Sequence, residues 1–181
     1  NRAQTAGLTL STSFDTNKTV SYASDGHLQQ FVQSEDVIRR IFSTTGAITF
    51  RPSFYNRHSF ILNYNRGSIA DTVFRLNSEY FQANTQLQQY FAFGYSFVHD
   101  RRDYVAYPLT GTEFTFNFNQ FGLGIFDDIN MTSTRLGYGT FSQLSKKLYL
   151  ANRVDIYKNF SDEIPYLIRA GFGYNPDFIR G

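Results

Sequence analysis

The chain has 181 residues, enough for one domain with a sizeable core, and it has no cysteine, which excludes disulfides and thiolate chemistry. Its formal net charge of +2 argues against a nucleic-acid-binding protein. Aromatic residues are abundant (20 Phe and 13 Tyr), and no apolar run reaches the about 18 residues of a transmembrane helix, a length that barrel strands do not need.

Seven segments alternate between large apolar residues and small or polar ones, the period-two pattern of strands with two different faces. They cover residues 5–14, 46–54, 57–66, 91–97, 114–119, 131–143 and 148–157. The first and sixth alternate less regularly, and Gly137 and Gly139 interrupt the sixth. These runs approach the ~9–11 residues that cross a bilayer obliquely and exceed the ~5–6 residues usual in soluble sheets. The pattern predicts an all-β fold of antiparallel transmembrane strands.

The connection at residues 15–45 carries apolar residues at a roughly helical spacing, with Asp25 or Ser34 as an N-cap. One interpretation is a helix on the membrane surface or in a barrel lumen. The alternatives are a short helix in a loop, or a further strand ending at residues 44–46. The apolar residues concerned are Leu28, Phe31, Val32, Ile38, Ile41 and Phe42.

Short and long connections alternate along the chain. Residues 53–57 and 145–147 make short turns, whereas residues 15–45 and 67–86 make long polar connections. Outer-membrane barrels have short periplasmic turns and longer extracellular loops, so the alternation gives the strands consistent directions. The connection at residues 100–111 is longer than a simple turn on the presumed periplasmic side.

Residues that could carry catalysis or bind metals are scattered. His27, His58 and His99 lack metal-ligand spacing, and no nucleophile elbow, zinc-protease motif or phosphate-binding loop occurs. Asp127 and Asp128 could bind calcium, but without a wider set of oxygen ligands a solvated loop is the better interpretation. We expect no catalytic residue, no metal and no cofactor, and therefore a protein that is not an enzyme.

Two carboxylates fall on the polar sides of predicted strands. In a barrel, Glu113 and Asp155 would point into the lumen, where water and either Arg153 or Arg135 would stabilise them. No distance between such carboxylates can be obtained from the sequence.

Two further segments stand out. In the first, Asp100, Arg102 and Asp103 can form a charge-assisted network, after which Pro108 and Gly111 redirect the chain into the next strand. The second, residues 165–181, is rich in glycine and aromatic residues and ends on Arg180 and Gly181. A guanidinium inside a barrel would need a buried carboxylate as its partner.

Together these segments resemble the barrel of the BamA/TamA surface-antigen family of outer-membrane proteins. Asp100, Arg102, Asp103, Pro108 and Gly111 match that family's D-x-R-D-x4-P-x2-G turn. The second segment resembles the family's sixth extracellular loop, here residues 160–181, whose V-R-G-F/Y tip would read Ile179, Arg180 and Gly181. The tip stops before the aromatic position.

The resemblance implies that residues 1–181 form a single barrel segment, about seven strands of a barrel of about sixteen. A seven-strand arc with open edges should not be stable alone, so we expect the chain to be part of a longer protein or complex. In that family Arg180 would anchor the sixth loop to a carboxylate on a strand outside this chain. The turn at residues 100–111 would shape the periplasmic rim.

The function implied by the resemblance is assembly, insertion or translocation of other proteins in the outer membrane of a Gram-negative-type bacterium. The expected partners are outer-membrane lipid and lipopolysaccharide, unfolded barrel or exported client proteins, and accessory subunits, with no nucleic acid. Three alternatives stay open: the membrane-anchoring barrel of a fused patatin-like lipase or phosphoesterase, a passive porin-like barrel, and a soluble β-sandwich or lipocalin-like binder. Aromatic rows that face lipid would exclude the soluble binder, ion conductance would indicate a porin, and the sequence upstream would separate an assembly barrel from an enzyme anchor.

Overall fold

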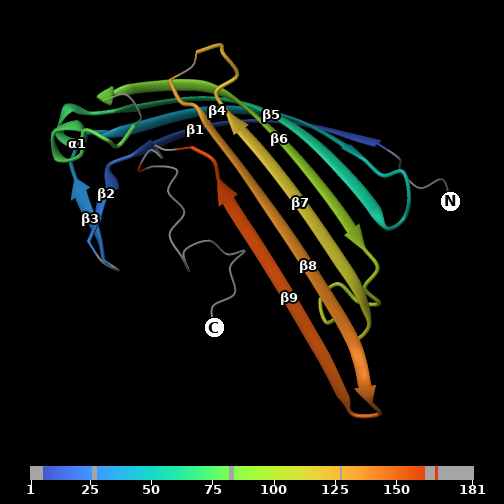
Figure 1. The fold of residues 1–181 in the computed structure, drawn as a ribbon. Coiled ribbons are helices and arrows are strands. Elements are labelled where there is room, and N and C mark those ends of the chain that lie inside the picture. The colour runs from blue at the N-terminus through green and yellow to red at the C-terminus, as the bar shows by residue number, and fades with distance from the viewer. Residues whose placement is uncertain (1–5, 26–27, 82–83, 127, 162–165, 167–181) are drawn as a thin grey trace.

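The computed structural model describes residues 6–25, 28–81, 84–126, 128–161 and 166. Their fold is all-β apart from one short helix (Figure 1). The elements in chain order are β1 (Ala6–Asn17), β2 (Thr19–Asp25), β3 (Leu28–Gln33), β4 (Arg39–Phe50), β5 (Asn56–Ile69), α1 (Asp71–Leu76), β6 (Leu87–Asp100), β7 (Gly111–Phe121), β8 (Met131–Ser145) and β9 (Leu148–Asn159).

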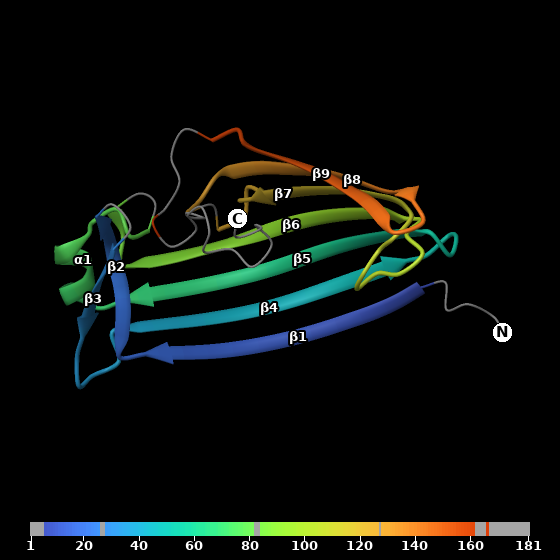
Figure 2. The same ribbon diagram turned by 90° about the horizontal axis from the view of Figure 1, so that it is seen from below.

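Seven strands form one curved antiparallel sheet in the order β1-β4-β5-β6-β7-β8-β9, while β2 and β3 pair as a separate hairpin (Figures 1 and 2). The sheet is not closed, and β1 and β9 are its edges among the described residues. All seven predicted strands are confirmed, although the segment predicted at 46–54 begins earlier, at Arg39, and ends at Phe50. The residues from 51 to 55 form the turn into β5 instead.

One face of the sheet, here called the apolar face, gathers the large residues of each alternating segment. The registers are continuous from β1 to β8, so residues directly opposite one another share a face. One such row runs across five strands, and the others repeat it. Its members are Leu8, Ile48, Phe60, Tyr95 and Phe118.

Aromatic rings on neighbouring strands contact one another across this face. The centroids lie 5.0 Å apart for Phe60 and Tyr95 and 5.1 Å apart for Tyr64 and Phe91. Such pairs add about 0.5–1.5 kcal/mol beyond the area they bury. The face nevertheless stays open to its surroundings, since Leu10 is 76% exposed. The apolar face is therefore an ordered and largely exposed surface, on which Phe126 of the β7–β8 loop packs against Tyr64 and Phe91 with ring centroids 6.2 Å away in both cases.

The opposite, polar face is tied together by side-chain hydrogen bonds. Asn63 donates from Nδ2 to the Ser43 hydroxyl at 2.9 Å and to the Thr45 hydroxyl at 2.7 Å. The hydroxyls of Thr49 and Ser59 lie 3.1 Å apart. Polar groups on this face thus have partners across the strands, which fixes the register as firmly as the apolar rows do.

A cap, formed by residues 18–38 and 70–81, lies at one end of the sheet (Figure 2). Its core joins the β2–β3 hairpin to α1, to the beginning of β4, to the end of β5 and to the segment after α1. Around this core lie Tyr22, Val32, Phe74 and Tyr166. The buried residues are Val20, Ile38, Ile69, Val73, Tyr80 and Phe81.

The helix predicted within residues 15–45 is wrong. That connection forms β2, β3 and the beginning of β4, and Leu28 and Phe31 are exposed rather than packed. Pairing of Arg39–Phe50 with β1 and β5 satisfies every ladder position there, and an isolated helix could not offer as much burial. The alternative of a further strand was nearer, although that strand continues to Phe50. The helix of the chain, α1, lies in the second long connection.

The connections β4–β5, β6–β7 and β8–β9 lie at the opposite end of the sheet, here called the turn end (Figure 2). The loop between β7 and β8 belongs to the cap end, where Ile129 packs with Tyr90 and Met131. Long and short connections therefore alternate as predicted with one exception, because the β6–β7 connection (101–110) at the turn end is one residue longer than the β7–β8 loop (122–130) at the cap end. Within the described chain, α1 is too short to cross a membrane.

Candidate functional site

The β6–β7 connection begins at Asp100, which holds Arg102 by three hydrogen bonds. Arg102 donates its backbone N–H to Asp100 Oδ1 at 3.0 Å, and its guanidinium donates to both carboxylate oxygens at 2.9 and 2.7 Å. This bidentate contact raises the pKa of the Arg102 guanidinium, which stays charged. The backbone N–H of Asp100 also donates to the Tyr55 carbonyl at 2.9 Å, which joins the turn to the β4–β5 turn.

Asp103 organises the rest of this turn. Its Oδ1 accepts backbone N–H bonds from Tyr104 at 2.9 Å, from Leu109 at 3.0 Å and from Thr110 at 3.1 Å. The bond from Thr110, helped by those from Leu109 and Tyr104, lowers the pKa of the exposed Asp103 carboxyl. One charged carboxylate therefore closes the turn at residues 103–110.

Gly111 allows the chain to leave this turn. Its φ is +114°, and a Cβ there would lie 2.2 Å from the carbonyl oxygen of Arg101. No side chain can occupy that space, so the position needs glycine. Pro108 lies half-buried in the same turn. The structure thus brings together the five residues that match the family motif.

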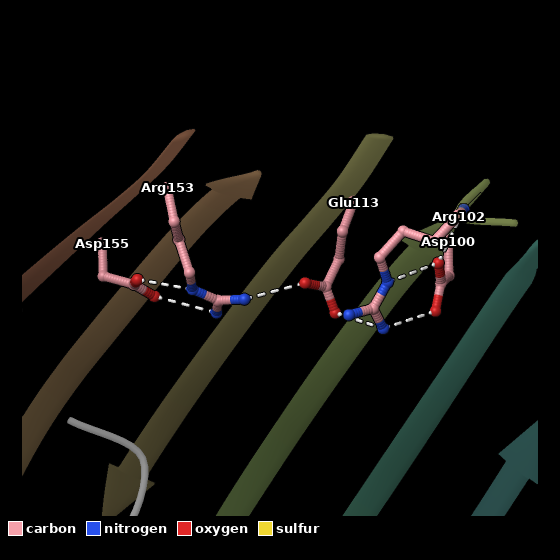
Figure 3. A network of polar contacts seen from close by, with 5 residues as sticks. All are labelled: Asp100, Arg102, Glu113, Arg153 and Asp155. Atoms are coloured by element: carbon pink, nitrogen blue, oxygen red, sulfur yellow. Dashed lines mark hydrogen bonds and ion pairs between the residues drawn. The ribbon is translucent and has the colours of Figure 1, made fainter. Parts of the chain in front are cut away.

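A row of charges extends from this turn over the polar face (Figure 3). Arg102 Nη2 lies 3.1 Å from Glu113 Oε1 on β7, and Arg153 Nη1 on β9 lies 2.7 Å from Glu113 Oε2. Arg153 also donates to both oxygens of Asp155 at 2.7 and 3.1 Å. We call Asp100, Arg102, Glu113, Arg153 and Asp155 the charged row.

Gly137 on β8 makes the link between β7 and β9 geometrically feasible. It lies opposite Thr115 on β7 and Asp155 on β9, directly between the strands that Arg153 joins. A Cβ at Gly137 would lie 2.5 Å from the Thr115 hydroxyl oxygen and 2.9 Å from Asp155 Oδ1. The space left by the missing side chain is the space that the charged row occupies.

Burial gives the row its energetic weight. Glu113 is 9% exposed, and the Arg102 side chain is 13% exposed. Removing one partner from partly buried ion pairs of this kind strongly destabilises the folded protein, because an uncompensated charge remains. With two guanidiniums, three carboxylates and no nucleophile, the row can hold strands and turn in place.

Sequence reasoning anticipated part of this arrangement. The expected pairing of Arg153 with Glu113 and Asp155 is confirmed, whereas Arg135 lies 6.0 Å from the centre of the Tyr157 ring. The contact between Arg102 and Glu113 was missed. The alternation that places Glu113 on the polar face could have suggested it, since Glu113 lies opposite Asp100.

The predicted loop tip, Ile179, Arg180 and Gly181, falls outside the part of the chain that the structure describes, as does most of the predicted sixth loop at 160–181. In that range Tyr166 packs against Tyr80 and its hydroxyl lies 2.5 Å from that of Ser21, at the cap.

Metal-binding candidates are also separate. His58 Nδ1 lies 2.9 Å from the Tyr95 hydroxyl, and His99 Nδ1 lies 2.6 Å from the Asn56 side-chain oxygen. Asp128 accepts the backbone N–H of Gln89 at 2.7 Å. His27 and Asp127 lie outside the described residues. No cluster of three metal-ligating side chains occurs in the part of the chain that the structure describes.

No protein-family model matches the chain, and a comparison with curated proteins also finds no match.

Proposed function

We propose that the chain forms part of the wall of an outer-membrane β-barrel whose protein assembles, inserts or translocates other proteins. The observation that carries the membrane part is the partition of charge between the two faces. The carboxylates of the seven-stranded sheet all lie on the polar face. They are Asp15, Asp100, Glu113 and Asp155.

An apolar face of this kind is unfavourable in water. Residues such as Leu10, Ile48 and Leu62 are more than half exposed on it, and each large aliphatic side chain gains about 1.5–3 kcal/mol when buried. Hydrocarbon supplies that burial for a strand but leaves no water for unpaired backbone groups. The edges β1 and β9 are therefore paired with further strands, which close the wall and enclose the polar face.

The connections favour one orientation. The cap and the β7–β8 loop lie at one end of the sheet and are the extracellular side, because extracellular loops of such barrels are the longer ones. The turn end, with residues 51–55 and 146–147 as short connections, is the periplasmic side.

The assembly function rests on the family resemblance of the β6–β7 turn. Asp100, Arg102, Asp103, Pro108 and Gly111 make one connected structure in which the charged row ties the turn to β7 and β9. A rigid periplasmic rim suits a barrel that holds a client strand while it pairs. In this mechanism Arg180 anchors the sixth loop, weakly paired strands template the client, and no nucleotide or catalytic residue takes part.

The membrane assignment can be tested with single cysteines, because the chain has none of its own. Leu10 and Ser11 are neighbours on β1, both exposed, and they face opposite sides. In native membranes, Ser11→Cys should react with a membrane-impermeant maleimide once the outer membrane is made permeable, and Leu10→Cys should not. Equal reaction of both cysteines would contradict the membrane assignment.

The assembly assignment needs a functional readout. Depletion of the protein should lower the amount of folded, heat-modifiable outer-membrane barrels and leave their synthesis unchanged. If folded barrels accumulate normally while purified protein conducts ions or hydrolyses lipid esters, the porin-like or enzyme-anchor alternative holds and the assembly proposal fails.

A further inference from the structure

The apolar face carries cations at one end and carboxylates nowhere among the described strand residues. Its charged side chains are Arg40 on β4, Arg66 on β5 and Lys158 on β9, each within three residues of the cap end of its strand. Every other charged residue of the seven strands lies on the polar face. The charge on this face is therefore of one sign and confined to the cap ends of these three strands.

Arg40 and Arg66 are close neighbours. Arg40 lies opposite Ser68 on β5, two residues from Arg66, and Arg66 lies opposite Phe42 on β4. Diagonal neighbours on adjacent strands are about 7–8 Å apart, so two guanidiniums at the ends of long side chains can reach one anionic group. Both arginines are exposed.

The surroundings of the pair fit the polar boundary of a bilayer. Thr16 and Ser68 flank Arg40 on the neighbouring strands. Phe42 lies opposite Arg66, and Tyr64 lies one step nearer the middle of the sheet, with its ring centroid 6.2 Å from that of Phe42. No carboxylate contact to Arg40 or Arg66 occurs among the described residues, in contrast to Arg75, which pairs with Asp71 at 2.6 Å on α1. The pair thus offers donors to a ligand from outside the chain.

We propose that Arg40 and Arg66 bind a phosphate group of a lipid headgroup in the outer leaflet, the phosphorylated glycolipid of that leaflet being the fitting partner. Guanidinium groups match phosphate oxygens with paired hydrogen bonds, and aromatic and aliphatic side chains directly below accept the acyl chains. Lys158 places a third cation near the cap end of β9. The inference rests on the proposed membrane-spanning function and adds the site and the chemistry of its lipid.

The experiment uses the protein purified in a neutral detergent and measures its affinity for bisphosphoryl lipid A and for the same lipid without phosphates. The double variant Arg40→Gln/Arg66→Gln should bind the phosphorylated lipid about 25-fold more weakly, about fivefold for each lost cation. Arg40→Lys/Arg66→Lys should retain most of the affinity. The control Arg51→Gln/Lys147→Gln removes two exposed charges at the turn end and should change nothing.

Three outcomes overturn the inference: equal affinity of wild type for the dephosphorylated lipid, an equal loss in the turn-end control, or unchanged binding by the Arg40→Gln/Arg66→Gln variant. Inorganic phosphate is the last arm. If millimolar phosphate displaces the lipid and itself binds through both arginines, the site serves free phosphate and the lipid proposal fails. If lipid binding fails these tests while Ser11→Cys is still labelled and Leu10→Cys is not, only the lipid-site inference is overturned. If both cysteines are labelled equally, the proposed membrane assignment is overturned as well.

Discussion

Gly137 shows how one missing side chain decides whether distant charges meet. The guanidinium of Arg153 reaches across β8 to Glu113, and the space above Gly137 is where Thr115 and Asp155 converge. The alternation of side chains along a strand indicates only which face of the sheet a charged residue occupies. The contact across an intervening strand depends also on the size of the residue between, and for that reason the sequence placed Glu113 correctly but left its link to Arg102 unseen.

The first prediction concerns this position. Gly137→Ala should lower the free energy of unfolding by about 1–3 kcal/mol, because the methyl group displaces partners of the charged row. Urea titration in detergent, followed by the heat-modified electrophoretic mobility of the protein, measures the loss. Gly46→Ala is the matched control, since a Cβ there has nothing within 4 Å. Similar stability of the two variants would refute the role given to Gly137.

The second prediction concerns Asp103 and acid. Its folded pKa is lowered, so its hydrogen bonds stabilise the turn fully above the ordinary Asp pKa of about 4 and are lost as the pH falls through the folded value. Amide exchange at Leu109 and Thr110, corrected for the intrinsic rate, should therefore accelerate below about pH 4. In Asp103→Asn the acid dependence should disappear. Acid-dependent exchange of equal size in the variant would exclude Asp103 as its source.

At the scale of elements, the cap is where the sequence misled. The apolar spacing over residues 28–42 is roughly helical, but five of the six apolar residues belong to two strands of different sheets, three to β3 and two to β4. Apolar residues from two elements, written in one line, can imitate a helix. The actual helix, α1, is six residues long and buries Val73 alone, which is too short for periodicity to reveal.

The third prediction tests whether the cap is a separate cooperative unit. Val73→Asp places a charge in a fully buried position between α1 and the hairpin. The cap should open locally, and proteases should cleave within residues 18–38 and 70–81 while the sheet stays intact. Thr72→Asp, an exposed neighbour on α1, is the control. If the Val73 variant also loses its heat-modified electrophoretic mobility, the cap and the sheet unfold as one unit.

At the scale of the whole molecule, the number and order of strands in the seven-stranded sheet followed from alternation and connection length, whereas the β2–β3 hairpin did not. These seven strands and their antiparallel pairing were predictable, because each alternating segment pairs with the alternating segments before and after it in the chain. The curvature and exact registers were not, since they depend on side chains that meet only in the assembled sheet. Ile48 on β4 and Phe60 on β5 are directly opposite one another, which shows that large apolar residues pair with each other once the register is set.

The fourth prediction compares the two faces. Leu10→Lys places a charge near the middle of β1 on the apolar face and should destabilise the membrane-inserted protein by about 2–4 kcal/mol. Thr9→Lys, the neighbour on the polar face, should have little effect, because both positions are exposed and only their surroundings differ. Folding titrations into lipid vesicles provide the measurement. Equal destabilisation would show that both faces meet the same solvent.

The cap hairpin also has a consequence for divergence among related chains. Asn17 and Arg39 are opposite one another at the ends of β1 and β4, so the 21 intervening residues, 18–38, leave and re-enter the sheet at adjacent points. The register of β1 against β4 is therefore independent of the length of the segment between them. In the orientation proposed above this segment is extracellular, where sequence changes selected by antibodies or phages would leave the strand pairing beneath it unchanged.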